Sequence, residues 1–145
     1  MSQHNDDNSE ADYRAEFIVE EPFLFADSVI YLKGSIRNSG AKDWDNSDSQ
    51  DATSFKVGLR VLSDSSRQPS RLLWEGRSDF SQDKICAGGS ARFEFFADLT
   101  KFAGNNILLV LDAIKESSFW FQDNGSSPVS FQVNIPKKLV HRTSR

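Results

Sequence analysis

The sequence predicts an all-β fold, specifically an immunoglobulin-like antiparallel β-sandwich of about 7–9 strands. Apolar and polar residues alternate along several short runs, and the breaks between these runs are rich in Asn, Asp, Gly and Ser. No segment carries the periodicity of about 3.6 residues that an amphipathic helix would show. A closed β-barrel is the main alternative, because the same alternation serves both architectures.

The expected strands follow one another along most of the chain. In order, they occupy residues 15–19, 30–36, 55–61, 72–77, 91–95, 106–114 and 129–135. Most of them alternate between apolar and polar positions, which is typical of a half-buried strand with one face toward a core. The run 106–114 is apolar on both faces for most of its length, as expected of a central strand.

Turn residues separate these runs. Clusters of Gly, Asn, Asp or Ser occupy residues 38–40, 64–66, 87–89, 104–106 and 123–125. The longer polar stretch 43–54 is expected to be the one extended loop.

Length and composition indicate one domain. A chain of 145 residues suits a single core, which we expect at residues 14–136, between a disordered or linker tail at 1–13 and a basic polar tail at 137–145. The net charge of -4 and the pI of about 5.1 argue against binding to a nucleic-acid backbone. The chain shows neither a signal-peptide pattern nor an apolar run of membrane-spanning length. One cysteine, Cys86, permits no intramolecular disulfide, so a cytoplasmic location is expected.

Motifs for catalysis and for metal binding are sparse. His4 and His141 lie in the predicted tails, where neither can serve as a fixed base for a nucleophile. One cysteine and two distant histidines cannot complete a zinc site, and glycine-rich phosphate-binding motifs are absent. We therefore expect a protein that is not an enzyme and that carries no cofactor and no metal.

Two acidic features are weighed against that expectation. The loop 43–51 offers four carboxylates, which calcium accepts as ligands, but it lacks the EF-hand spacing, so a solvated loop is favoured. The pairs Glu20 with Glu21 and Asp112 with Glu116 supply the residue type that glycosidases use. Structural roles at strand ends and sheet margins are the favoured interpretation of both pairs.

Aromatic and polar residues combine into a candidate binding site. A flat indole beside hydrogen-bonding side chains is the composition of a sugar site, and all three tryptophans have polar or charged neighbours. The expected ligand contacts are Trp44, Arg60, Trp74, Arg77, Asp112 and Trp120. Core packing is the competing interpretation for each tryptophan. In the segment 119–121, alternate side chains point to opposite faces, so either Trp120 or its two phenylalanine neighbours must face the core.

The order of these features resembles a known bacterial module. The matching segments are a strand at 28–37, Asn38-Ser39-Gly40 followed by Trp44, a strand at 57–61, Trp74-Glu75-Gly76-Arg77, Gly88-Gly89 leading into 91–96, a strand from Gly104 to Asp112, and Trp120-Phe121-Gln122-Asp123-Asn124-Gly125. This pattern resembles the immunoglobulin-like accessory domains of bacterial surface-polysaccharide proteins. It is also similar to the carbohydrate-binding C-terminal domain of O-antigen ABC transporter ATPase subunits, and that resemblance implies recognition of a finished glycan before export.

The sequence is therefore compatible with two functions. The first is non-catalytic recognition of an O-antigen-type polysaccharide for export or assembly. Its protein partner would be a second copy or a parent transporter or transferase, with neither nucleic-acid binding nor membrane insertion. The alternative is a protein-interaction or dimerisation module without a glycan ligand, which would use an exposed sheet face or an edge strand.

Overall fold

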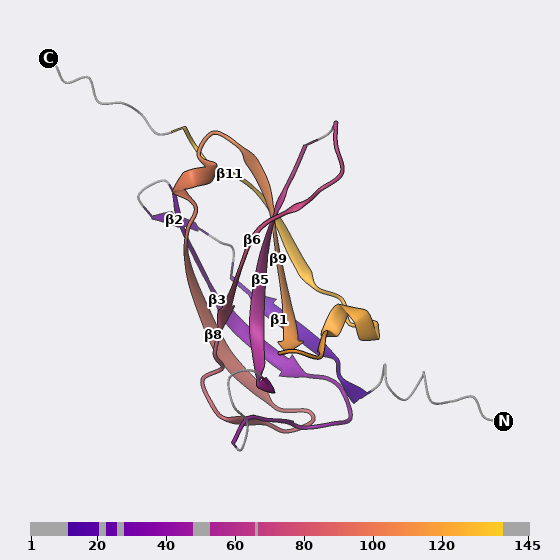
Figure 1. The fold of residues 1–145 in the computed structure, drawn as a ribbon. Coiled ribbons are helices and arrows are strands. Elements are labelled where there is room, and N and C mark those ends of the chain that lie inside the picture. Colours follow the sequence, from indigo (N-terminus) through magenta and orange to yellow (C-terminus); the bar gives the residue numbers. More distant parts are fainter. Residues whose placement is uncertain (1–11, 21–22, 26–27, 48–52, 66, 138–145) are drawn as a thin grey trace, which may run out of the picture.

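The computed structural model describes residues 12–20, 23–25, 28–47, 53–65 and 67–137. The strands are β1 (Ala15–Val19), β2 (Phe23–Phe25), β3 (Val29–Asn38), β4 (Trp44–Asp45), β5 (Phe55–Ser63), β6 (Leu72–Ser78), β7 (Lys84–Ile85), β8 (Ser90–Asp98), β9 (Asn106–Lys115), β10 (Phe119–Trp120) and β11 (Val129–Asn134) (Figure 1). Short 3₁₀ helices are η2 (Thr100–Phe102) and η3 (Phe121–Asn124). The predicted all-β class is confirmed. Most of the predicted tails, residues 1–11 and 138–145, lie outside the described residues.

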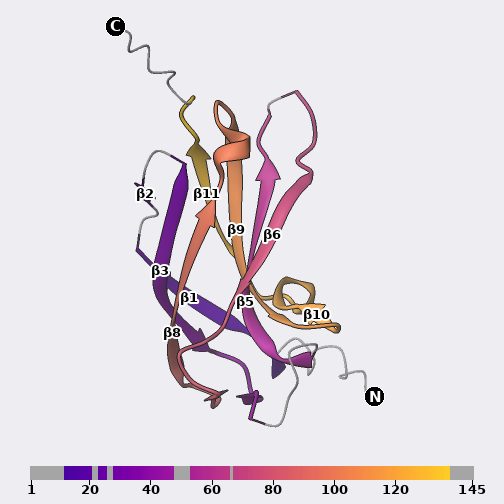
Figure 2. The same cartoon turned by 60° about the vertical axis from the view of Figure 1, so that its left-hand side comes forward.

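Antiparallel pairing builds two sheets that face each other (Figure 2). In the first, called the β3 sheet, β3 pairs with β8 along one edge and with β1 and β2 along the other. In the second, called the β9 sheet, β9 pairs with β5 along one edge and with β10 and β11 along the other, and β6 pairs with the far edge of β5. The short strands β4 and β7 form a separate ribbon.

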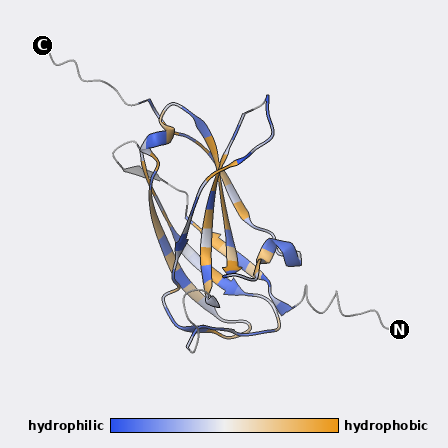
Figure 3. Ribbon diagram, in the orientation of Figure 1, coloured by the Kyte–Doolittle hydropathy of each residue, from blue (hydrophilic) through white to orange (hydrophobic). Residues whose placement is uncertain are grey.

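The core lies between the inner faces of these sheets. Along β8, exposed and buried side chains alternate without a break, as the period-two pattern predicts. Figure 3 shows the same alternation of polar and apolar residues along the strands. The inward-facing side chains include Ile30, Leu32, Ile36, Val57, Leu59, Val61, Phe93, Phe95, Ile107, Leu109 and Leu111, each at most 4% exposed. Since inner faces of this kind pack at crystal-like density, they fix how the sheets lie against each other.

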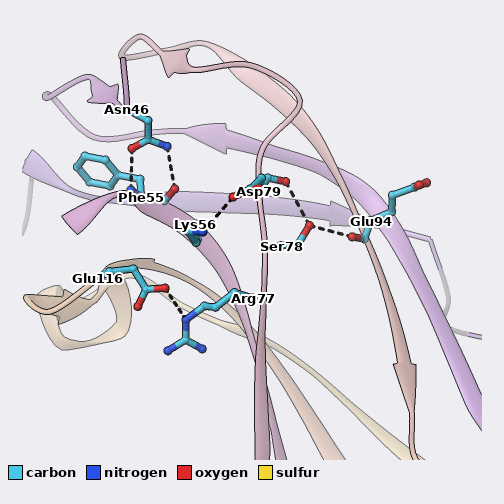
Figure 4. Close-up of polar contacts among 8 residues, drawn as sticks. All are labelled: Asn46, Phe55, Lys56, Arg77, Ser78, Asp79, Glu94 and Glu116. Atoms are coloured by element: carbon cyan, nitrogen blue, oxygen red, sulfur yellow. Dashed lines mark hydrogen bonds and ion pairs between the residues drawn. The ribbon is translucent and has the colours of Figure 1, made fainter. Parts of the chain in front are cut away.

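Aromatic rings fill one end of the sandwich, where β5 begins. Trp44 is 1% exposed, and its ring lies 5.0 Å from that of Phe121 in an edge-on arrangement. The ring centroid of Tyr13 lies 5.2 Å from that of Phe119 and 5.9 Å from that of Phe55. Asn46 fixes the backbone of Phe55, because its side-chain amide accepts from the Phe55 N–H at 2.7 Å and donates to the Phe55 carbonyl at 2.9 Å (Figure 4). We call the packed rings of Tyr13, Trp44, Phe55, Phe119 and Phe121 the aromatic plug.

One polar contact joins the two sheets at the end of β6, where Ser78 Oγ donates to the carbonyl oxygen of Glu94 on β8 at 2.9 Å (Figure 4). Next to it, Lys56 Nζ of β5 lies 3.1 Å from Asp79 Oδ1, directly after β6. No helix within the described residues is long and apolar enough to cross a membrane.

Replacing Trp44 with alanine is expected to lower the free energy of unfolding by roughly 3–5 kcal/mol, because it removes a fully buried ring from the aromatic plug. Urea unfolding followed by circular dichroism measures this change. Trp44→Phe, which keeps one aromatic ring in the same space, should recover part of the loss. A loss below about 1 kcal/mol for the alanine variant would contradict the buried position.

Candidate functional site

Four of the six predicted contact residues come together on the outer face of the β9 sheet. Trp120 from β10 lies over Gly58 of β5, with its ring carbons 2.4 and 2.5 Å from where a β-carbon of that residue would sit. The guanidinium carbons of Arg60 and Arg77 lie 4.3 and 4.9 Å from the centroid of the Trp120 ring. A glycine at position 58 is needed here because any side chain would occupy the place of the indole. We call Arg60, Arg77 and Trp120 the arginine–tryptophan cluster.

The cluster is tied together by its own polar contacts. Arg77 Nε donates to Glu116 Oε2 at 2.8 Å, as Figure 4 shows, and Arg77 Nη2 donates to Glu75 Oε1 at 2.8 Å. Arg60 Nη2 donates to Gln122 Oε1 at 2.9 Å. Since cation–π contacts and charged hydrogen bonds reinforce each other here, the cluster holds the segment 116–125 against the sheet. Its guanidinium groups lie where a sugar ring would have to stack on the indole.

Asp112 is buried beneath this segment. It lies on the outer face of β9 opposite Gly58 and is 0% exposed. Its Oδ1 accepts from the backbone N–H of Ala113 at 2.9 Å, and its Oδ2 accepts from that of Gln122 at 2.8 Å. Burial raises the pKa of Asp112 from 3.8 to about 6, although these hydrogen bonds and Arg60 act in the opposite direction. The carboxyl group therefore anchors the start of η3 from inside the protein.

The other two predicted contacts lie elsewhere. Trp44 belongs to the aromatic plug, away from the surface. Trp74 is half-buried on the edge strand β6, opposite Val61, and packs against the core. Its ring carbon approaches within 2.4 Å of where a β-carbon of Gly76 would sit. The indole rings of Trp44 and Trp74 thus contact the core, as expected if these tryptophans serve core packing.

The acidic features of the sequence have structural partners where they are described. Asp43 accepts from the Ala87 N–H at 2.9 Å, and Asp45 accepts from the Ser47 N–H at 3.0 Å. Residues 48–51 of the acidic loop and Glu21 lie outside the described residues. Over the ranges that are described, no group of three or more His, Cys, Asp or Glu side chains is placed to hold a metal ion.

A groove lies at the end of the sandwich opposite the aromatic plug. Its larger hollow, of about 620 Å³, lies between the β5–β6 loop and the turn that leads from η2 into β9. An adjoining hollow of about 360 Å³ runs along the end of β11 and shares Asp64 and Asn106 with the larger one. Both loops stand at the upper end in Figure 2. We call the two hollows together the loop-end groove.

Planar polar side chains dominate the lining of the groove. Guanidinium groups come from the β5–β6 loop, amides come from β9, β11 and the turn before β9, and one carboxylate comes from Asp64; Phe102, Leu73 and Val133 add apolar surface. The polar lining residues are Asp64, Arg67, Arg71, Asn105, Asn106, Gln132 and Asn134, with Ser63 and Ser65. Such a mixture can hydrogen-bond several hydroxyl groups while an apolar wall contacts C–H faces.

Backbone hydrogen bonds hold the walls of the groove in place. At the base of the β5–β6 loop, the Ser63 N–H donates to the Arg71 carbonyl at 2.9 Å, and the Arg71 N–H donates to Ser63 Oγ at 3.0 Å. On the other wall, the Gly104 N–H donates to the Ile135 carbonyl at 2.7 Å. Gly104 has a φ of +85°, which a residue with a side chain rarely adopts. Hydrogen bonds therefore hold the backbone at the base of both walls of the groove.

The sequence singles out 64–66 and 104–106 only as turns. Their shared chemistry, a concentration of Asp, Asn and Ser beside Arg67 and Arg71, is visible in the sequence. Their proximity depends on β5, β6 and β9 being neighbours in one sheet, and local patterns do not specify that order.

Comparisons with known proteins leave the family unassigned. No family model matches the chain, and no curated protein matches it. Similar solved structures are β-glucosidases from Listeria innocua in complex with isofagomine (13% identity, TM-score 0.46), Bifidobacterium adolescentis (11%, 0.41) and Kluyveromyces marxianus in complex with glucose (9%, 0.42). The match covers 88%, 83% and 84% of this chain but only 17%, 17% and 14% of those chains. This chain thus spans a small part of each enzyme.

Asp112 is expected to make stability depend on pH between about 4 and 6. Its pKa is higher in the folded state than in the unfolded chain, so its contribution to stability is complete below the unfolded value of 3.8. That contribution is lost as pH rises through about 6. The loss amounts to about 3 kcal/mol for a shift of this size.

Urea unfolding of the wild type and of Asp112→Asn at several pH values between 4 and 7 isolates this effect, because asparagine does not titrate. The stability of the wild type relative to the variant should fall across this interval. A difference that stays constant with pH would show that Asp112 has an ordinary pKa in the folded protein.

Proposed function

We propose that this chain is a non-catalytic carbohydrate-binding β-sandwich, and that it recognises a bacterial surface polysaccharide of the O-antigen type for export or assembly. The glycan lies in the loop-end groove. The observation that carries the proposal is the lining of that groove, in which residues with amide and guanidinium groups lie beside the apolar surface of Phe102 and Leu73, on loops whose bases are held by hydrogen bonds.

The free hydrogen-bonding capacity of the lining supports a polyhydroxylated ligand. Asn134 Nδ2 donates to Asn106 Oδ1 at 2.7 Å. This contact leaves the side-chain N–H groups of Asn106 and the side-chain oxygen of Asn134 available to a ligand. Gln132 adds a further amide on the same strand as Asn134. Amides of this kind both donate to and accept from sugar hydroxyls, which themselves do both.

The lining also supports binding without hydrolysis. Most glycosidases place two carboxyl groups about the scissile bond, one as the acid and one as the base or nucleophile. Among the described residues that line the groove, Asp64 supplies the single carboxyl group. Asp112 and Glu116 lie in or beside the arginine–tryptophan cluster, where backbone N–H groups and Arg77 engage them.

The choice of an O-antigen-type polysaccharide rests on the order of sequence features, from Asn38-Ser39-Gly40 and Trp44 to the Trp120-Phe121 hairpin. In this proposal the arginine–tryptophan cluster, which includes the residue types of a sugar site, has a structural role. The ligand contacts lie at the loops instead.

Calorimetric titration against a panel of purified bacterial O-polysaccharides tests the proposal. We expect at least one member to bind, and Asn106→Ala to weaken that binding about tenfold, because Asn106 lines both hollows. Gln122→Ala is the matched control, since this exposed amide lies in η3 at the other end of β9. A folded protein that binds no member would refute the proposal, and a loss on Gln122→Ala alone would move the site to the arginine–tryptophan cluster.

A second candidate function is self-association through the outer face of the β3 sheet. Phe96 is 62% exposed and stacks on Tyr31 with ring centroids 4.5 Å apart, and Ile18 on the same face is 74% exposed. Phe96 and Ile18 lie on the same outer face, on opposite sides of β3, and large exposed apolar side chains of this kind can take part in an interface. A second copy of this chain is the occupant to test, because the face also carries charges of both signs, including Lys33 and Glu94.

Multi-angle light scattering distinguishes this candidate. If the face is an interface between copies, the protein should be a dimer at micromolar concentration and Phe96→Glu should make it monomeric, because a buried carboxylate is unfavourable. Ile18→Glu should have the same effect, whereas Leu72→Glu on the β9 sheet should leave the dimer intact. A wild-type monomer would dismiss the candidate without affecting glycan binding.

A further inference from the structure

Two arginines in the loop-end groove have no partner within the described part of the protein. Arg67 and Arg71 line the larger hollow from the β5–β6 loop, and their guanidinium groups make no hydrogen bond or ion pair with a described residue. Arg37 and Arg77, by contrast, are paired with glutamates. The charges of Arg67 and Arg71 are therefore available to a ligand.

The electrostatic balance of the groove differs from that of the whole chain. The chain carries 21 acidic and 17 basic residues, yet the described lining of the groove contains two arginines and one carboxylate, Asp64. Lys137 adds a further positive charge nearby, since its Cγ lies 3.2 Å from where a β-carbon of Gly104 would sit. A positive site on an acidic protein favours anionic ligands over neutral ones.

On the basis of the carbohydrate-binding function proposed above, we propose that the loop-end groove selects an anionic saccharide that carries a carboxylate group. Arg67 and Arg71 bind the carboxylate, and the amides of Asn105, Asn106 and Gln132 bind neighbouring hydroxyls. A uronic acid or another acidic sugar within a polysaccharide has this combination of groups.

The chemistry of arginine suits this role. Its planar guanidinium group can donate two parallel hydrogen bonds to a carboxylate, which adds direction to the attraction between the charges. The hydrogen bonds at the base of the loop fix the backbone of Arg71, and the Arg67 N–H donates to Ser65 Oγ at 3.2 Å. Because these hydrogen bonds already hold the backbone at Arg67 and Arg71, less backbone entropy is lost when the two residues bind a ligand.

Asp64 gives the groove an acceptor beside these donors. It lines both hollows, so it stands between the arginines and the amides of β11. A carboxylate at this point accepts hydrogen bonds from sugar hydroxyls and repels a second anion.

Binding of matched glycan pairs tests the inference. Acidic bacterial polysaccharides are compared by calorimetry with their carboxyl-reduced forms, in which each carboxylate becomes a hydroxymethyl group and the backbone is unchanged. We expect an acidic form to bind and its reduced form to bind about 10–100-fold more weakly, as the loss of a charged hydrogen-bonded pair predicts. Affinity for the acidic form should also fall as salt concentration rises.

Variants locate the charge recognition. Arg67→Gln and Arg71→Gln should each weaken binding of the acidic form about tenfold and leave the reduced form unaffected. Arg92→Gln is the matched control, because Arg92 is also exposed but lies on β8 in the β3 sheet. Thermal denaturation confirms that each variant is folded.

The possible failures are distinguishable. If a glycan binds equally well before and after carboxyl reduction, and Asn106→Ala weakens it while the arginine variants do not, charge selection is overturned and carbohydrate binding stands. If only neutral polysaccharides bind, charge selection is also overturned. If no polysaccharide binds, acidic or neutral, the proposed function fails together with this inference.

Discussion

Burial of β9 on both faces is the constraint that organises this molecule. Its inner side chains, among them Leu109 and Leu111, are completely buried in the core. Its outer face carries Val110, Asp112 and Ile114, which are also buried, although one sheet of a sandwich ordinarily has its outer face in water. A further layer must therefore cover this face, and the segment 116–125 supplies it. The placement of the arginine–tryptophan cluster follows from this need.

The segment 116–125 explains why Arg60, Arg77 and Trp120 lie together in an arrangement that resembles a binding site. An indole can approach the sheet closely only where a strand lacks a side chain, and Gly58 provides the place. Arg60 and Arg77 then lie over the ring, and Glu75, Glu116 and Gln122 engage their donors. Asp112 fixes the start of η3 from below. Tryptophan, arginine and carboxylate thus occur together because they stabilise one another, and the same composition would equally suit a sugar.

The parts of the fold that depend on local pattern could be predicted from the sequence, and those that depend on distant pairing could not. The inward positions of Leu59, Phe93 and Leu109 follow from period-two alternation, which is a property of each strand alone. The burial of Trp44 does not, because its neighbours Asp43 and Asp45 are polar and its position in the core depends on contacts with distant residues, including the β4–β7 pairing. The loop-end groove is even harder to predict from the sequence. Arg71, Asn106 and Asn134 meet there only through the strand order β6–β5–β9–β11, which turn residues do not encode.

The two ends of the sandwich differ in how the space between the sheets is filled. Where β5 begins, large rings such as Trp44, Phe55 and Phe121 pack in that space. Where β5 ends, Phe102 and Leu73 are only half-buried, and the lining beyond them is polar. Polar side chains cannot close such a gap without losing hydration, so the gap stays open unless a ligand replaces the water. Because hydrogen bonds between backbone groups hold the loop bases, the lining can change its chemistry with little cost to the core. Packed aromatic rings and the polar lining of the loop-end groove thus lie at opposite ends of the same small domain.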